Sequence, residues 1–129
     1  MIEPYGREAT SLNSPSLPLR GEIWLVNFDP TIGAEIRKTR PAVVVSSDGM
    51  GRLPIKLVAP ITEWKDAFQQ SAWLVRINPD SRNCLTKASA ADVLQMRGMD
   101  LRRFMSRLGM VSPEIMAELA AAVAIVVEY

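Results

Sequence analysis

The chain has 129 residues, of which 48% are hydrophobic and 22% are charged. This length suits one domain with a buried core, and the composition excludes disordered, fibrous and coiled-coil classes. Because 15 basic and 14 acidic residues leave a net charge of +1, any nucleic-acid binding must depend on local basic patches.

The absence of histidine and the presence of only one cysteine limit the catalytic and metal sites that the chain can form. The chain has no histidine, which removes Ser-His and Cys-His nucleophile pairs and almost every zinc site. Its single cysteine, Cys84, cannot form an intramolecular disulfide, and no segment resembles a secretory signal, so we expect the cytoplasm. The longest apolar stretch, at 119–127, is shorter than the roughly 20 residues that cross a bilayer. We therefore expect no membrane span.

In chain order, residues 1–19 carry prolines and scattered Ser, Thr and Asn without periodicity, which predicts a flexible extension before one domain at 20–129. Short runs rich in Val, Ile and Trp then predict strands at 21–28, 40–48, 55–62 and 72–77. Residues 91–100 alternate Val93, Gln95 and Arg97 against Leu94 and Met96, which predicts a strand with one polar and one apolar face.

A last strand is predicted at 108–112, followed by a helix at 113–127. Ser112 suits the N-cap of this helix, Pro113 its first position and Glu114 its positive end. The helix is apolar almost all round, which predicts cover from more than one side, either by a second subunit or by the rest of the same chain. Closely spaced short strands favour a mainly β fold, a small antiparallel barrel packed against this helix.

Several short motifs follow one another in a fixed order along the chain. They are an Arg-Gly-Glu start at residues 20–22, an Asp-Pro at 29–30, Gly33-x-Glu35, Arg40-Pro41, a strand ending in Thr62, and Gln95-x-Arg97. This ordered set resembles the MazF/PemK family of toxin-antitoxin ribonucleases, and the resemblance extends over residues 20–129.

The resemblance implies an SH3-like barrel that forms a homodimer. It also implies cleavage of single-stranded RNA, chiefly messenger RNA, at short motifs without metal or cofactor, and neutralisation by a cognate antitoxin. Carried over by position, Arg40 and Thr62 are the implied catalytic pair, Glu35 lies nearby on the loop, and Gln95 and Arg97 contact RNA.

The implied reaction is attack of the neighbouring 2′-hydroxyl on the phosphate, which requires stabilisation of charge on the phosphate oxygens. The forked donors of Arg40 and the hydroxyl of Thr62 suit that task. Arginine keeps its proton in proteins and is a poor base, so Glu35 is the candidate base on the condition that it is partly buried.

A basic run and two aromatic residues are the candidates for holding RNA. Arg37, Lys38 and Arg40 would attract phosphates, and binding would weaken as salt rises. Trp64 and Phe68, just after the Thr62 strand, could stack an unpaired base.

Each of these residues also has an ordinary structural interpretation. The basic run could be a solvated loop, and Thr62 a strand residue chosen for packing. Glu35 could be a surface carboxylate paired with Arg37 or Lys38. Gln95 and Arg97 could form the outer face of a half-buried strand, and the two aromatics could be core or dimer anchors.

Two other functions share this fold. One is a non-enzymatic poison of DNA gyrase resembling the CcdB family, and the other is an RNA-binding barrel that cuts nothing. The pair Arg40 and Thr62 with its Gly-x-Glu loop favours the ribonuclease over the gyrase poison, which does not need it.

Overall fold

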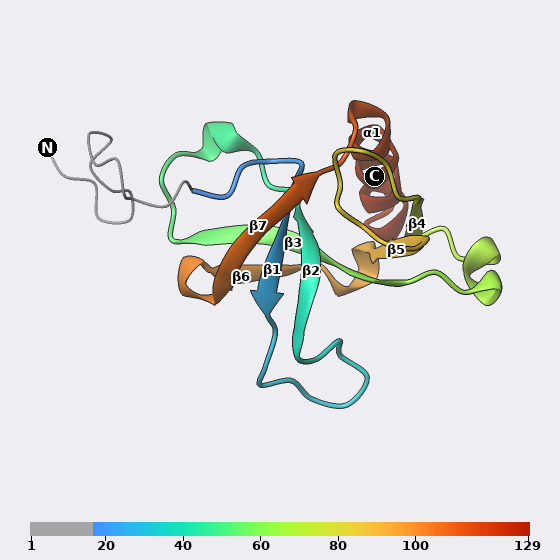
Figure 1. Cartoon of the computed structure of the whole chain (residues 1–129), viewed down its shortest axis with the longest axis horizontal. Coiled ribbons are helices and arrows are strands. Elements are labelled where there is room, and N and C mark those ends of the chain that lie inside the picture. The colour runs from blue at the N-terminus through green and yellow to red at the C-terminus, as the bar shows by residue number, and fades with distance from the viewer. Residues whose placement is uncertain (1–16) are drawn as a thin grey trace, which may run out of the picture.

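The structure is a computed structural model that describes residues 17–129. It has seven strands and one C-terminal helix (Figure 1). The strands are β1 Glu22–Asn27, β2 Thr39–Val44, β3 Ile55–Glu63, β4 Leu74–Ile77, β5 Ser89–Asp92, β6 Arg97–Asp100 and β7 Phe104–Met110, and the helix is α1 Pro113–Val126. Short 3-10 helices lie at η1 Asp48–Met50, η2 Asp66–Gln70, η3 Val93–Gln95 and η4 Leu101–Arg103.

All strand pairs are antiparallel, in the order β4-β5-β3-β2-β1-β7, with β6 also paired to β3. β3 is the central strand: it pairs with β2 and β6 through its first part and with β5 through its last. The sheet curls into an open, barrel-like form, which confirms the predicted mainly β fold.

The predicted single strand at 91–100 is wrong, because η3 interrupts it. Asp92 ends β5, and its side chain accepts a hydrogen bond from the backbone N–H of Gln95 at 3.2 Å. Such a local side-chain bond offers the backbone a turn in place of the sheet ladder. Val93 is therefore buried and Leu94 is 61% exposed, the reverse of the predicted faces.

Two apolar clusters fill the molecule. One lies within the barrel and contains Trp24, Val26, Phe28, Val58 and Met99, among others. The other lies between the sheet and α1, where the helix contributes Met116, Leu119 and Ala122. Because strand side chains alternate between faces, the two clusters occupy opposite faces of the central strands.

The ends of the predicted elements need small corrections. β7 begins at Phe104, before the predicted start at residue 108. The helix prediction is confirmed: the Ser112 hydroxyl accepts from the N–H of Ile115 at 3.2 Å, and Pro113 opens the first turn.

Most of the predicted extension, residues 1–16, lies outside the described residues, but Pro18 is already buried in the domain. Over residues 17–129, no helix is long and apolar enough to cross a membrane.

Candidate active site

Arg40 and Thr62 lie just beyond the end of the β2–β3 pairing. The last pair is Ala42 with Pro60, and Arg40 lies two residues before Ala42 while Thr62 lies two residues after Pro60. Both side chains share the face of Ala42 and Pro60, since side chains alternate along a strand. Beyond Pro60, β3 pairs with β5, so Thr62 also borders the second part of the sheet.

Arg97 lies on this same face. It pairs with Val58 on β3, two alternations from Thr62, and its Nη1 donates to the carbonyl of Phe28 at 3.2 Å. Phe28 begins the loop between β1 and β2, so Arg97 holds the start of that loop over the sheet face. The predicted strand residue is therefore also a support for the loop.

The β1–β2 loop, residues 28–38, projects from the sheet in Figure 1 and carries the predicted charged residues. Its backbone is folded by local bonds: the N–H of Lys38 donates to Asp29 Oδ1 at 2.9 Å, and the Nε of Arg40 donates to the carbonyl of Arg37 at 3.0 Å. Lys38 has φ of 70°, which orients the chain into β2. Arg37 and Lys38 are both exposed, which leaves two cations facing solvent beside the sheet.

Glu35 is also exposed, so the burial on which its action as a base depended is absent from this structure. Its Oε1 accepts from the N–H of Ile32 at 2.7 Å, and its own N–H donates to the Ile32 carbonyl at 3.2 Å. This reciprocal pair shapes the loop tip and leaves the second carboxylate oxygen of Glu35 outside that bond.

Gln95 lies between the sheet and the loop, and Asp92 orients it, a contact that sequence patterns did not reveal. Gln95 Oε1 accepts from the N–H of Ile36 at 2.6 Å, while its Nε2 donates to Asp92 Oδ2 at 3.2 Å. Asp92 is only 9% exposed, and this burial raises the pKa of its carboxyl against the lowering effect of the Gln95 hydrogen bonds. A buried carboxylate kept at an electrostatic cost is typical of functional sites.

The aromatic candidates lie beyond Thr62 at the β4 side of the sheet. Trp64 and Phe68 form an edge-to-face pair with ring centroids 5.7 Å apart. Arg76 on β4 places its Cζ 4.9 Å from the centroid of the Trp64 ring. Arg76 is not among the residues predicted from the sequence, because only the strand pairing brings it to this ring.

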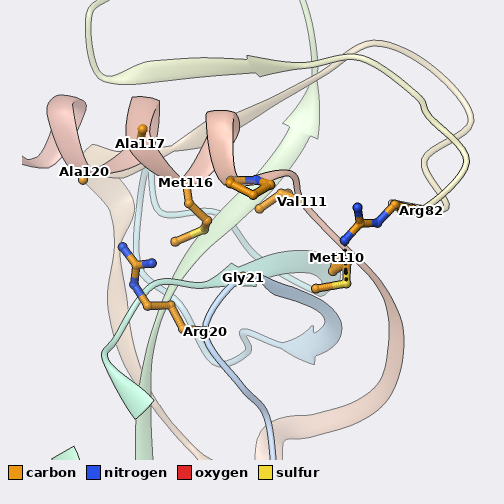
Figure 2. A pocket seen from close by; sticks show the side chains of 9 residues that line it. Arg20, Gly21, Arg82, Met110, Val111, Met116, Ala117 and Ala120 are labelled. Carbon is orange, nitrogen blue, oxygen red and sulfur yellow. Dashed lines mark hydrogen bonds between the residues drawn. The ribbon is translucent and has the colours of Figure 1, made fainter. Parts of the chain in front are cut away.

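Hollows in the surface occur in several places. One of about 380 Å³ is lined by Glu35, Gln95 and Arg97, so it belongs to the candidate site. A hollow of about 430 Å³ lies between Arg20, Arg82 and the start of α1 (Figure 2) and contains none of the predicted site residues. The candidate site is the hollow lined by Glu35, Gln95 and Arg97, because it carries the predicted charged and polar residues. Within residues 17–129, no three or more His, Cys, Asp or Glu residues form a group able to hold a metal ion.

Comparison with known proteins gives the family. A sequence model described as PemK-like, MazF-like toxin of type II toxin-antitoxin system matches residues 19–127. The chain belongs to this family. The endoribonuclease toxin ChpB of Escherichia coli K12 is 33% identical over 111 residues, which cover 84% of this chain and 93% of that protein. Endoribonuclease MazF9 of Mycobacterium tuberculosis is 32% identical over 106 residues, covering 78% and 87%.

Solved structures of family members share the fold. MazF from Deinococcus radiodurans superposes with a TM-score of 0.74 at 21% identity, covering 89% of this chain and all (100%) of that one. A mycobacterial endoribonuclease in complex with its cognate antitoxin has a TM-score of 0.67 at 19% identity, covering 86% and 95%. At these identities the likeness establishes the fold, and the assignment of site residues depends on the geometry described above.

Proposed function

We propose that this chain is an endoribonuclease toxin that cleaves single-stranded RNA, chiefly messenger RNA, at short sequence motifs. The observation that carries the proposal is the shared face of Arg40, Thr62 and Arg97, with the basic β1–β2 loop tied to its edge. This face supplies what phosphodiester cleavage needs: directed donors for a phosphate and cations for the neighbouring backbone. We place the reaction in the cytoplasm.

Arg40 and Thr62 are proposed to clamp the scissile phosphate. The Arg40 guanidinium offers five donors in a planar fork, of which the bond to the Arg37 carbonyl uses Nε. That bond fixes the guanidinium before RNA arrives, so little reorganisation is needed as charge develops. The Thr62 hydroxyl donates a further hydrogen bond to the phosphate from the facing strand.

Glu35 is proposed as the base that removes the proton of the attacking 2′-hydroxyl. Its carboxylate is exposed in the free protein, and RNA bound over the face would cover it and exclude water around it. Arg40 stays protonated throughout and donates hydrogen bonds to the phosphate oxygens. As the bond from the 2′-oxygen to phosphorus forms, the bond from phosphorus to the 5′-oxygen breaks, and the 5′-oxygen takes a proton from solvent to leave as a hydroxyl.

The remaining site residues are proposed to bind the rest of the RNA. Arg37 and Lys38 contact backbone phosphates from the exposed loop. The guanidinium N–H groups of Arg97 that do not bond to the Phe28 carbonyl donate to a phosphate. Gln95 contacts RNA at the point where its side chain links the sheet to the loop. Trp64 stacks an unpaired base.

A cognate antitoxin and a second copy of the chain are the proposed protein partners. An acidic segment of the antitoxin would cover the basic loop and block RNA, as folding of a disordered segment on a partner surface permits. The test is loss of cleavage when the product of a neighbouring antitoxin gene binds; binding with unchanged cleavage would contradict this occlusion. Sedimentation of the purified chain tests the homodimer.

The test of the activity is cleavage of a long unstructured RNA by purified protein in excess EDTA, with the ends mapped. We expect site-specific cuts with 2′,3′-cyclic phosphate ends, reduced about 10²- to 10³-fold in Arg40→Ala and clearly reduced in Thr62→Ala, because each variant removes a donor to the developing charge. Arg82→Ala, in the separate hollow of Figure 2, is the matched control and keeps full activity. Absence of cutting across varied RNAs would instead favour a gyrase poison or a binding module.

A further inference from the structure

Arg76 lies in the same cross-strand row as the proposed phosphate clamp. Thr62 on β3 pairs with Ala90 on β5, and Ala90 pairs with Arg76 on β4. Residues directly opposite in a ladder share a face, so Arg76 lies on the Thr62 face at two strand spacings, or about 10 Å between Cα atoms. A strongly charged, exposed side chain thus continues the row that begins at Arg40.

Trp64 joins Arg76 across two small residues. The N–H of Trp64 donates to the Ala88 carbonyl at 3.0 Å, so the chain continues alongside β5 beyond the end of β3. Two residues past Thr62, Trp64 returns to the same face. Because only Ala90 of β5 and Ala88, just before β5, lie between them, the Arg76 guanidinium reaches the indole, with its Cζ 4.9 Å from the ring centroid.

Further contacts hold both side chains in place. The Nε of Arg76 donates to Asn78 Oδ1 at 3.0 Å, and Phe68 meets the Trp64 ring edge-to-face. Beside them lies a hollow of about 410 Å³, whose wall also includes Leu74 and, from α1, Glu118. A guanidinium held over the face of an aromatic ring offers a planar cation on which an unpaired base can stack, with N–H donors left for a phosphate.

We propose that Arg76 and Trp64 form a subsite for one unpaired nucleotide next to the scissile phosphate, with the base stacked on the Arg76–Trp64 pair and the phosphate on the guanidinium donors that the bond to Asn78 does not use. This inference rests on the proposed function, because it takes RNA as the ligand of the face. It adds to the clamp a contact on the β4 side, opposite the side on which the β1–β2 loop lies. The two contacts together would fix the direction of the RNA strand across the sheet.

The experiment is direct binding of short, fully 2′-O-methylated RNA oligomers of mixed sequence, which cannot be cut, followed by fluorescence anisotropy. Trp64→Ala should weaken binding by about 5- to 150-fold, the loss expected for one base stack, whereas Trp64→Phe keeps most of the affinity. Arg76→Ala should also weaken binding and reduce the salt slope by about 0.7, the value for one phosphate contact with a single strand. Arg82→Ala is the matched arginine control, and thermal melting of each variant shows that it is folded.

The outcomes separate the subsite from the proposed function. If Arg76→Ala binds like Arg82→Ala and Trp64→Ala binds like wild type, the subsite is wrong, even when wild type cuts RNA and Arg40→Ala does not. If wild type binds the oligomers with the expected dependence on Trp64 and Arg76 but cuts no RNA, the subsite stands and the nuclease proposal fails. If wild type cuts RNA but does not bind the oligomers, the subsite alone is overturned, and if wild type neither binds nor cuts, both are overturned.

Discussion

Asp92→Asn should separate stability from activity, because Asp92 is a buried carboxylate that orients Gln95. The wild-type carboxylate accepts from both the backbone N–H and the side-chain Nε2 of Gln95, each at 3.2 Å. Asparagine has one oxygen and one amino group in their place, so one of these contacts becomes donor against donor. Gln95 would then lose the orientation in which its Oε1 accepts from the N–H of Ile36.

The size of the effect on cleavage follows from that 2.6 Å bond to the β1–β2 loop. A hydrogen bond of this kind contributes about 0.5–1.5 kcal/mol net. The ratio of the observed loop position to other positions should therefore fall about 2- to 12-fold, and kcat/KM should fall by up to the same factor. We expect Gln95→Ala to show at least this fall, because it also removes the proposed contact of Gln95 with RNA, and the double variant to be no worse than Gln95→Ala, since Asp92 acts through Gln95.

Stability should change differently. Burial raises the pKa of Asp92 above its ordinary value of 3.8, so the folded state holds this proton to higher pH than the unfolded chain does. Wild-type stability therefore falls as pH rises from 3.8 through the raised pKa, and Asp92→Asn removes that loss. At pH 7 we expect the free energy of unfolding in urea for Asp92→Asn to be no more than about 1 kcal/mol below that of wild type.

Asp100→Asn is the matched control, because Asp100 caps η4 as Asp92 caps η3. Hydrogen bonds from exposed Arg102 lower the pKa of Asp100, so its stabilising contribution is present above 3.8 and is lost as pH falls, the opposite sign. Its substitution should leave cleavage unchanged. If Asp92→Asn loses stability and activity in proportion, or keeps full activity, Asp92 does not position the loop through Gln95.

Four further predictions follow from individual contacts. Glu35→Gln should lower kcat by about 10²- to 10⁴-fold, the contribution of a general base, and an unchanged kcat would exclude Glu35 as the base. Gly109→Ala should destabilise by at least about 1–3 kcal/mol in urea, because the added Cβ would lie 2.4 Å from the backbone oxygen of Arg82; Gly98→Ala, which meets only a side-chain methyl at 3.0 Å, should cost less. Glu22→Gln should lower the free energy of unfolding by about 1–3 kcal/mol, because the buried Glu22 carboxylate accepts from Arg107 Nε at 2.8 Å; equal stability of Glu22→Gln and wild type would contradict this. Deletion of residues 1–16 should leave RNA cleavage intact. Loss of cleavage in a shortened chain that remains folded would show that the extension contributes to activity.

Much of the architecture could be predicted from local sequence. Four runs of Val, Ile and Trp bounded by Gly, Pro and Asp gave strands close to β1–β4, because alternation and turn residues act within a few positions. The start of α1 at Ser112 and Pro113 could also be predicted from local sequence, because the capping hydrogen bond joins Ser112 to Ile115, only three residues away. The order of motifs around Arg40 and Thr62 was enough to predict the family.

Only the tertiary structure decided how the site residues are used. Asp92 bonds to Gln95 and stops the strand, so the alternation in residues 91–100 does not become two sheet faces. Gln95 then reaches Ile36, 59 positions away along the chain, a contact that no periodicity indicates. Arg76 joins the row of Thr62 through two strand pairings, and the loop leaves Glu35 exposed. Local sequence sets which segments are strands, whereas register and burial arise when distant segments pack, and these place the charges of the site.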